Sequence, residues 1–289
     1  MVNNRAEIVK ILKNSKDPIS GERIGIILNI SRTGVWKNIK KLIDEGYTII
    51  SNHSGYSLLP EEDQLNNYEF SNKIDGYQYL ETTESTMDIA YKRIEQGKAI
   101  NGSVILSSNQ KNGRDNNNEG FNSPTGGLYF TLTIFPNSSL TKASDINIYS
   151  MTALLSIRDG FRNNMGVETK GVWPFESYIG TKKVGGILLD YRIEGRNIKW
   201  INIGIGINIG RKIPRKKMLL TIREELLNRL KEPNNIISEY KRYIDTKENL
   251  DQKLESLIDI DKYGTLVIQE NNNIKFIYVD DKNRRKNEH

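Results

Sequence analysis

The chain contains no cysteine and only two histidines, His53 and His289, among its 289 residues. The absence of cysteine excludes disulfides, thiolate metal sites and cysteine nucleophiles. Two histidines argue against a zinc site or a histidine-based catalytic centre. The N-terminus lacks an apolar signal core, and no apolar run reaches the length of a membrane span. We therefore expect a soluble cytoplasmic protein with no bound metal and no membrane partner.

The charge is unevenly distributed along the chain. Residues 1–60 hold nine Lys and Arg against five Asp and Glu, which leaves +4 of the total net charge of +6 in the first fifth of the sequence. A local basic excess of this kind indicates nucleic acid or another anionic surface as a partner. The length suits about two or three domains.

The first 60 residues predict three short helices and a hairpin. Residues 4–14 place apolar side chains at helical spacing, and Ser20 is a good N-cap for a second helix. Ser31 caps a third helix that Gly46 ends. A hairpin follows from Tyr47 to Leu59. This order predicts a winged helix-turn-helix DNA-binding domain over residues 1–60.

The third helix is predicted to enter the major groove of DNA. Its lysines would attract phosphates, whereas Arg32 or Thr33 would read base edges. A solvated helix face is the alternative for the lysines, and packing beneath the wing is the alternative for Trp36. The candidate DNA-binding residues are Ser31, Arg32, Thr33, Trp36, Lys37 and Lys40.

The remainder alternates strand-like and helical segments, which predicts an α/β fold with a largely antiparallel or mixed sheet. Helical patterns cover 87–96, 146–163 and 217–246, and strand-like runs cover 77–79, 104–107, 127–134, 186–191 and 198–209. The predicted parts after the first domain are a linker (61–68), the α/β domain (69–246), a small C-terminal β-module (247–281) and a basic tail (282–289).

The stretch from Val172 to Asp190 carries a rigid Trp173-Pro174 corner, two lysines and a Gly-Gly pair. Proline fixes its own φ and keeps the preceding residue out of the helical region. Lys183 precedes a predicted strand, 184–189, whose glycines permit close approach to the backbone. A cation at this point suits an anionic ligand. The alternative is a β-hairpin with a solvated lysine turn.

Several motifs in a fixed order resemble the bifunctional biotin operon repressor/biotin–protein ligase family. They are, after the winged helix, E-S-T, Q-x-x-G-R, S-P-x-G-G-L-Y, W-P, a lysine before V-x-G-I-L, G-I-G-I-N and a terminal β-module. The resemblance spans nearly the whole chain, and its specificity lies in the order of the motifs.

The resemblance implies a biotin site and an adjoining ATP site. Ser85, Thr86 and Gln110 would hydrogen-bond the ureido ring of biotin, because hydroxyls and an amide suit a neutral urea. Lys183 would bridge the biotin carboxylate and the α-phosphate, and it would be catalytic together with Arg114 in an active enzyme. The implied biotin-binding residues are Ser85, Thr86, Met87, Gln110, Gly113, Arg114, Asn116, Lys183 and Gly186, and the ATP-side residues are Glu176, Lys183 and Asn208. A helix N-cap is the alternative role for Ser85 and Thr86, and a turn cap is the alternative for Asn208.

The sequence departs from the family where ATP and magnesium would bind. The family loop G-R-G-R-R-G-R-x-W has lost arginines at Asn116, Asn117 and Glu119, and the family K-W-P-N-D has become V-W-P-F-E. Joining a carboxylate to ATP brings two anions together and needs preorganised cations. The urea-binding groups are kept while cations are lost, which argues against ATP and magnesium binding and favours weak or no adenylation.

Three functions remain open at this point. The first is a DNA-binding transcription regulator that binds biotin, or a relative, in a ligase-like domain. The second is an active biotin–protein ligase and repressor, with biotin carboxyl carrier protein as a partner. The third is a DNA-binding protein with a ligand-free dimerisation domain. The first also implies a ligand-linked homodimer on a two-fold symmetric operator.

Overall fold

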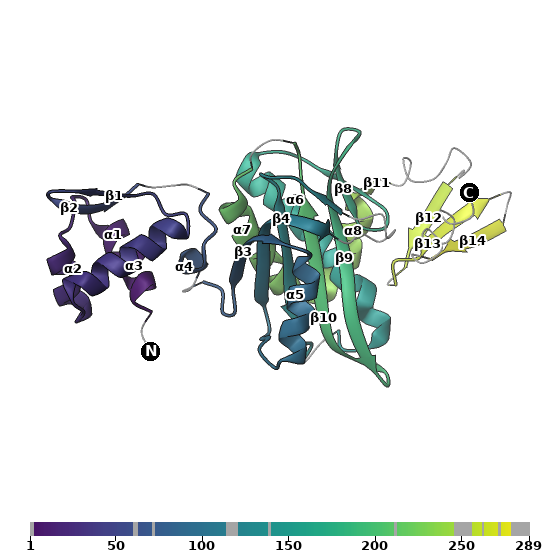
Figure 1. The fold of residues 1–289 in the computed structure, drawn as a ribbon. Coiled ribbons are helices and arrows are strands. Elements are labelled where there is room, and N and C mark those ends of the chain that lie inside the picture. Colours follow the sequence, from purple (N-terminus) through teal and green to yellow (C-terminus); the bar gives the residue numbers. More distant parts are fainter. Residues whose placement is uncertain are drawn as a thin grey trace. The chain divides into compact units, whose positions relative to one another are not determined.

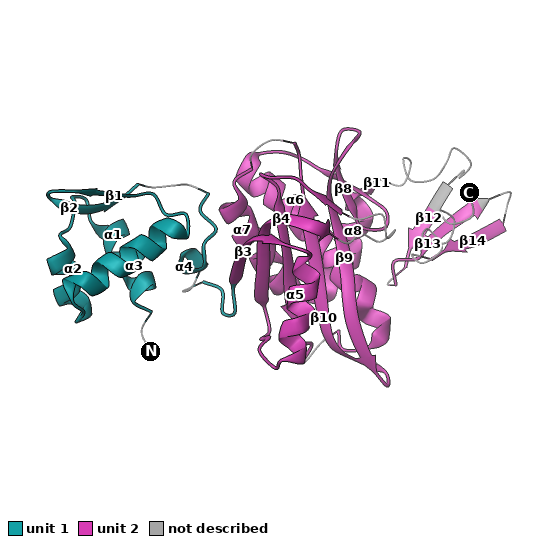
Figure 2. Ribbon diagram, in the orientation of Figure 1, with its two compact units in different colours: residues 1–77 teal, residues 78–289 magenta. Residues whose placement is uncertain are grey.

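The computed structural model describes residues 3–59, 63–70, 73–113, 121–137, 140–210, 213–245, 256–261, 263–270 and 273–278. The chain divides into two compact units, residues 1–77 and residues 78–289, which we call unit 1 and unit 2 (Figure 2). None of the helices in the described part of the chain is long and apolar enough to cross a membrane.

Unit 1 begins with three short helices, two of which start at a hydroxyl side chain. Ser20 Oγ accepts a hydrogen bond from the Arg23 N–H at 3.2 Å, and Ser31 Oγ accepts one from the Gly34 N–H at 3.0 Å. Both are N-cap bonds, which satisfy amides that have no partner within the helix. The elements are α1 (Asn4–Asn14), α2 (Gly21–Leu28), α3 (Arg32–Asp44), β1 (Ile49–Asn52), β2 (Gly55–Leu58) and α4 (Asn67–Phe70) (Figure 1).

The core of unit 1 lies between the three helices, and the hairpin is tied to it. Ile24, Val35 and Leu42 are fully buried. Tyr56 of β2 exchanges two backbone hydrogen bonds with Ile19, at 3.0 and 2.9 Å, just ahead of α2. The helices and the hairpin therefore form one packed body, and the predicted winged helix-turn-helix plan is confirmed.

The stretch that precedes unit 2 packs onto the winged helix. Gln64 Nε2 donates to the Gly46 carbonyl at 2.8 Å, and both Phe70 and Ile74 are buried. Residues 63–68 of the predicted linker, 61–68, are described, and they belong to this packed segment.

Unit 2 is built on a nine-stranded sheet with the order β11-β7-β8-β9-β10-β6-β4-β3, in which β5 pairs with β4. The pairs β3–β4 and β11–β7 are parallel, and the remaining pairs are antiparallel. The predicted α/β class with a mixed sheet is confirmed. The strands are β3 (Gln78–Thr83), β4 (Ser103–Gly113), β5 (Phe121–Ser123), β6 (Leu128–Ile134), β7 (Lys170–Val172), β8 (Glu176–Ile179), β9 (Lys182–Glu194), β10 (Asn197–Ile207) and β11 (Ile244–Asp245).

The two faces of this sheet carry different helices, because side chains alternate along each strand. A Cβ at Gly204 of β10 would lie 2.8 Å from Met87 Sδ, so this face meets α5. A Cβ at Gly185 of β9 would lie 3.7 Å from Ile157 Cγ2, so the opposite face meets α6. The helices of unit 2 are α5 (Thr86–Glu95), α6 (Ile146–Met165), α7 (Arg215–Lys231) and α8 (Ile236–Tyr243) (Figure 1).

The structure corrects several predicted element bounds. The strand predicted over 184–189 begins at Lys182 and ends at Glu194, because it pairs with β10 along most of its length. Strands β5, β7, β8 and β11 were not predicted, since two to four residues are too few to show a period of two. The helical region predicted over 217–246 ends at Tyr243 and is interrupted after Lys231.

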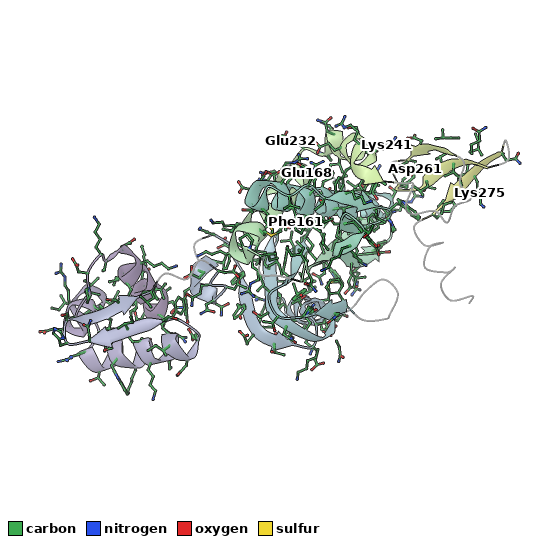
Figure 3. The ribbon with its side chains drawn as sticks, turned by 90° about the horizontal axis from the view of Figure 1, so that it is seen from above. Phe161, Glu168, Glu232, Lys241, Asp261 and Lys275 are labelled. Atoms are coloured by element: carbon green, nitrogen blue, oxygen red, sulfur yellow. The ribbon has the colours of Figure 1, made fainter. Side chains whose placement is uncertain are left out.

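A separate antiparallel sheet of β12 (Ser256–Ile260), β13 (Leu266–Glu270) and β14 (Asn273–Ile277) occupies the predicted β-module. Trp173 Nε1 donates to the Gly264 carbonyl at 2.9 Å and so attaches this sheet to the rest of unit 2. Lys241 of α8, labelled in Figure 3, also pairs with Asp259 of β12. The predicted basic tail, 282–289, lies outside the described residues.

Candidate functional site

The ends of β3 and β4 bring three predicted biotin-binding side chains together. β3 pairs in parallel with β4, with Thr83 opposite Gln110. Ser85 Oγ then accepts from the Met87 N–H at 3.3 Å and caps α5. Gln110 Oε1 accepts from the Thr86 N–H at 2.8 Å and from Thr86 Oγ1 at 3.0 Å. The local βα turn therefore gives Ser85 its helix-cap role and places Thr86 against the amide of Gln110.

Two further hydroxyls extend this group into a polar cluster. Thr131 Oγ1 donates to Thr86 Oγ1 at 2.9 Å, and Gln110 Nε2 donates to Ser123 Oγ at 3.0 Å. Ser85, Thr86, Ser123 and Thr131 are all buried. Buried polar groups need partners, and here each bonds another member or the adjoining backbone. The cluster of Ser85, Thr86, Gln110, Ser123 and Thr131 offers the donors and acceptors that a urea group requires.

Glycines beside the cluster make room for an aromatic ring. A Cβ at Gly206 of β10 would lie 2.3 Å from Phe121 Cζ, and one at Gly186 of β9 would lie 3.9 Å from Phe121 Cε2. The Phe121 ring therefore lies against these two central strands. Its ring centroid is 6.0 Å from that of Tyr129, in an edge-to-face arrangement. Burial raises the pKa of Tyr129 to about 12, so its hydroxyl stays protonated and donates to the Pro124 carbonyl at 2.8 Å.

Lys183 and Glu176 form an ion pair next to Gly186. Lys183 Nζ donates to Glu176 Oε1 at 2.8 Å, and Tyr178 OH donates to Glu176 Oε2 at 3.2 Å. The side chain of Lys183 is 43% exposed and that of Glu176 is 25% exposed. The antiparallel register explains the contact, because Glu176 is opposite Gly186 and Tyr178 is opposite Lys183. The structure thus joins two residues that the sequence placed on the ATP side.

The apolar residues of the Trp-Pro corner serve packing. Val172, Trp173 and Phe175 are buried, and Tyr240 OH donates to the Pro174 carbonyl. This corner supports α8 and the C-terminal sheet.

Asn208 has the turn-cap role that was its alternative. Its Oδ1 accepts from the Gly210 N–H at 2.8 Å, and its own N–H donates to the Val184 carbonyl at 2.8 Å. These contacts fix the exit of β10 next to the start of β9. A role toward ATP stays a prediction.

The family loop lies largely outside the described residues. The structure describes its two ends, Gly113 and Phe121. A Cβ at Gly113 would lie 2.4 Å from the Phe121 carbonyl oxygen, so glycine is required by the pairing of β4 with β5. Arg114 and Asn116, both predicted to contact biotin, belong to the residues that the structure does not describe, as do Asn117 and Glu119. Their roles stay predictions.

The predicted DNA-binding residues lie on one exposed side of α3. Arg32, Thr33, Lys37 and Lys40 are exposed, whereas Val35, Ile39 and Leu42 are buried. The alternative that Trp36 packs beneath the wing is wrong, because its side chain is 53% exposed. A surface hollow of about 410 Å³ beside the N-terminus of α3 is lined by Glu22, Gly25, Ile26, Asn29, Ile30, Ser31 and Arg32. This hollow lies in unit 1 and includes no residue of the polar cluster. The polar cluster of unit 2 is therefore identified as a candidate site by its side-chain chemistry alone.

Four residues of the candidate site were not predicted as site residues. Ser123 belongs to the S-P-x-G-G-L-Y motif, and Phe121 stands at the aromatic end of the family loop, so both carried a usable signal. Thr131 and Tyr178 carried none, because only strand register brings them to the site. Across the residues that the structure describes, no group of three His, Asp or Glu side chains has the geometry of a metal site.

The sequence comparisons divide the chain in the same way. A family model described as an HTH domain matches residues 4–57, and one described as the biotin/lipoate A/B protein ligase family matches residues 79–208. The bifunctional ligase/repressor BirA of Bacillus subtilis (strain 168) is 27% identical over 217 residues, which span 72% of this chain but only 66% of that protein. BirA of Escherichia coli (strain K12) is 27% identical over 193 residues, or 66% of this chain and 59% of that protein.

Solved structures show the same fold. The biotin protein ligase from Aquifex aeolicus in complex with biotin and ATP matches with a TM-score of 0.55 at 18% identity, covering 71% of this chain and 96% of that chain. The biotin protein ligase from Leishmania major in complex with biotin matches with a TM-score of 0.52 at 18% identity, covering 70% of this chain and 98% of that chain.

Proposed function

We propose that this chain, which belongs to the bifunctional biotin operon repressor/biotin–protein ligase family, is a transcription regulator whose unit 2 binds biotin or a relative and adenylates it weakly or not at all. Unit 1 binds DNA through α3. Biotin binding promotes a homodimer, which carries two winged helices to a two-fold symmetric operator.

The polar cluster is the observation that supports biotin as the ligand. Thr86 and Gln110 lie in hydrogen-bond contact, and Ser85 lies in the same βα turn. A urea carbonyl would accept from these hydroxyls, and the urea N–H groups would donate to the amide oxygen of Gln110. The donor set therefore fits the ureido ring of biotin.

The residues present fit biotin, but they do not fit ATP and magnesium. Both carboxylate oxygens of Glu176 already accept hydrogen bonds, one from Lys183 and one from Tyr178. Val172 and Phe175 are apolar and buried where the family has polar residues. A phosphate-transfer site needs cations that are preorganised toward the phosphates. The residues present therefore do not support an adenylation step in this chain.

Calorimetry tests the ligand assignment. The full chain would be titrated with biotin alone, with biotin plus Mg-ATP, and with biotinyl-adenylate. We expect binding of biotin that Mg-ATP does not strengthen, together with no pyrophosphate exchange above background. Failure to bind either biotin or biotinyl-adenylate would exclude a biotin-responsive regulator.

A working ligase is the second candidate, and one observation favours it. Lys183 and Glu176 are kept side by side, and Lys182 lies close by, donating from Nζ to the Ile209 carbonyl at 3.0 Å. Pyrophosphate exchange that Lys183→Met abolishes would establish this candidate in place of the first. A biotin carboxyl carrier protein would then be the acceptor to test.

The DNA assignment needs a separate measurement. Arg32→Ala should weaken binding to a selected duplex more than to a random duplex, because arginine reads base edges. Lys37→Ala should weaken both duplexes about equally, because lysine contacts phosphates. An affinity that does not depend on salt would contradict phosphate contact by α3.

A further inference from the structure

Trp36 is the one tryptophan of this chain with a largely exposed side chain. The sequence has three tryptophans, of which Trp173 is 2% exposed, Trp200 is 8% exposed and Trp36 is 53% exposed. Indole carries a large apolar surface that is normally buried in a core or at an interface. Its exposure on α3 therefore indicates a surface that becomes covered by a partner.

The charges around Trp36 indicate what the partner is. Lys40 Nζ lies 5.7 Å from the centroid of the Trp36 ring, and Arg32 and Lys37 are exposed one helical turn before it and directly after it. The first turn of α3 carries no acidic residue. An exposed aromatic ring with one cation beside it and two more on the same helix is complementary to a polyanion that also offers an apolar group.

We propose that Trp36 reads DNA sequence by packing its ring on the C5-methyl group of thymine in the major groove. The inference rests on the proposed binding of DNA by α3 and adds to Arg32 a second residue that selects the sequence. Phosphates satisfy Lys37 and Lys40 regardless of sequence, whereas Arg32 reads base edges by hydrogen bonds. The thymine methyl is the apolar group that base edges offer in the major groove, so the ring selects T-containing steps.

Phosphate contacts and the packing of Trp36 on a thymine methyl predict different salt dependences of DNA binding. Contacts from lysine and arginine to phosphates release counterions and weaken as salt rises. Packing of an apolar ring on a methyl group depends little on salt. Trp36→Ala should therefore lower affinity by on the order of tenfold at every salt concentration, whereas Lys37→Ala should lower it mostly at low salt.

The decisive test removes the methyl groups from the DNA. Duplexes would be selected from a randomised library with the full wild-type chain, and the strongest duplex would be resynthesised with deoxyuridine in place of each thymidine in turn. Loss of one contacted methyl should weaken wild-type binding about fourfold. The Trp36→Ala chain should show no loss at that position, and the Lys37→Ala chain should keep the full fourfold loss.

Fluorescence gives an independent readout in the same protein. Trp173 and Trp200 are buried, so acrylamide should quench mainly Trp36. We expect the selected duplex to protect that emission from quenching, whereas its deoxyuridine form should protect less at equal saturation. Trp36→Phe removes the quenchable component and, as an exposed substitution, leaves unfolding unchanged.

The outcomes separate this inference from the proposed function. Tight, salt-dependent duplex binding with no deoxyuridine effect at any position, or with the same effect in Trp36→Ala, overturns the reading of thymine and leaves DNA binding intact. Equal protection of Trp36 by single-stranded DNA also overturns it, since stacking on unpaired bases would then explain the exposure. Absence of any duplex binding overturns both the inference and the DNA-binding function.

Discussion

At the scale of single residues, Thr86 holds the polar cluster together. Its hydroxyl donates to Gln110 Oε1 and accepts from Thr131 Oγ1, so its removal leaves both neighbours with one bond fewer. A ligand urea must exchange partners with these groups, and such an exchange is close to neutral in free energy when every bond is replaced. Affinity therefore depends on the complete set of hydroxyls.

Thr86→Val is the first prediction at this scale. Valine keeps the shape but cannot bond the urea, so we expect biotin affinity to fall at least tenfold and unfolding free energy to fall by about 1 kcal/mol. Calorimetry and urea unfolding measure the two effects. Thr133→Val is the matched control, because Thr133 is also buried, lies on β6 two residues after Thr131, and donates to Asn202 Oδ1 at 2.8 Å. It should lower stability and leave biotin affinity unchanged; an equal loss of affinity in both variants would contradict a specific role for Thr86.

The Lys183–Glu176 pair gives the second prediction. Glu176→Gln removes the carboxylate that holds Lys183 Nζ and frees that ammonium for a ligand carboxylate. We expect affinity for biotin to rise severalfold, while affinity for the uncharged biotin methyl ester stays the same. The cost in stability should be at most about 1 kcal/mol, because exposed pairs contribute little. If Glu176→Gln changes the affinities for biotin and for biotin methyl ester equally, Lys183 does not contact the ligand carboxylate.

At the scale of secondary-structure elements, a charge network joins three helices of unit 2. Asp159 of α6 accepts from Arg158 Nε at 2.9 Å and from Arg229 Nη2 of α7 at 2.5 Å. Glu239 of α8 accepts from Arg158 Nη2 at 3.2 Å. The side chains of Asp159, Arg158 and Arg229 are only 10%, 15% and 16% exposed. Removal of the central carboxylate would leave two poorly hydrated cations facing each other.

Asp159→Asn is therefore expected to lower the unfolding free energy of unit 2 by about 3 kcal/mol. Urea unfolding followed by the emission of Trp173 and Trp200, in a Trp36→Phe background, reports on unit 2 alone. Glu225→Gln is the control, since Glu225 bonds the same Arg229 at 3.0 Å but is 36% exposed, and it should cost about 0.3–0.5 kcal/mol. Equal effects would show that burial does not decide the strength of this network.

The elements also show what could be predicted from the sequence. The caps Ser20 and Ser31 and the long helices were predictable, because their signals lie within a few residues along the chain. Thr131 and Tyr178 were not, since each reaches the site only through antiparallel strand register. The position of Trp36 was ambiguous for the same reason, because only the packing of the wing decides whether its ring is covered.

At the scale of the whole molecule, the two proposed functions lie in separate units, and the proposed dimer is the link between them. The segment ahead of unit 2 bonds the winged helix, since Tyr47 OH donates to Glu69 Oε1 at 3.3 Å and Gln64 Nε2 donates to the Gly46 carbonyl. Strand β3, which starts at Gln78, leads directly to Ser85. A ligand that raises the dimerisation constant by some factor raises the overall constant for two monomers binding one operator by that same factor. The reason is that both equilibria pass through the dimer. The coupling is therefore measurable on DNA.

The salt dependence of operator binding counts the copies of α3 on the duplex. Each lysine that contacts a phosphate contributes about 0.9 to the slope of log affinity against log salt. Lys37→Ala should therefore lower the slope by about 0.9 for a bound monomer and by about 1.8 for a dimer, since both copies carry the change. We expect the larger difference with biotin and the smaller one without it, measured on one selected duplex.

Lys199→Ala, an exposed change in unit 2 that removes a surface pair with Glu194, should leave the slope unaltered. Identical slope differences with and without biotin would mean that the ligand does not change the number of winged helices on the DNA.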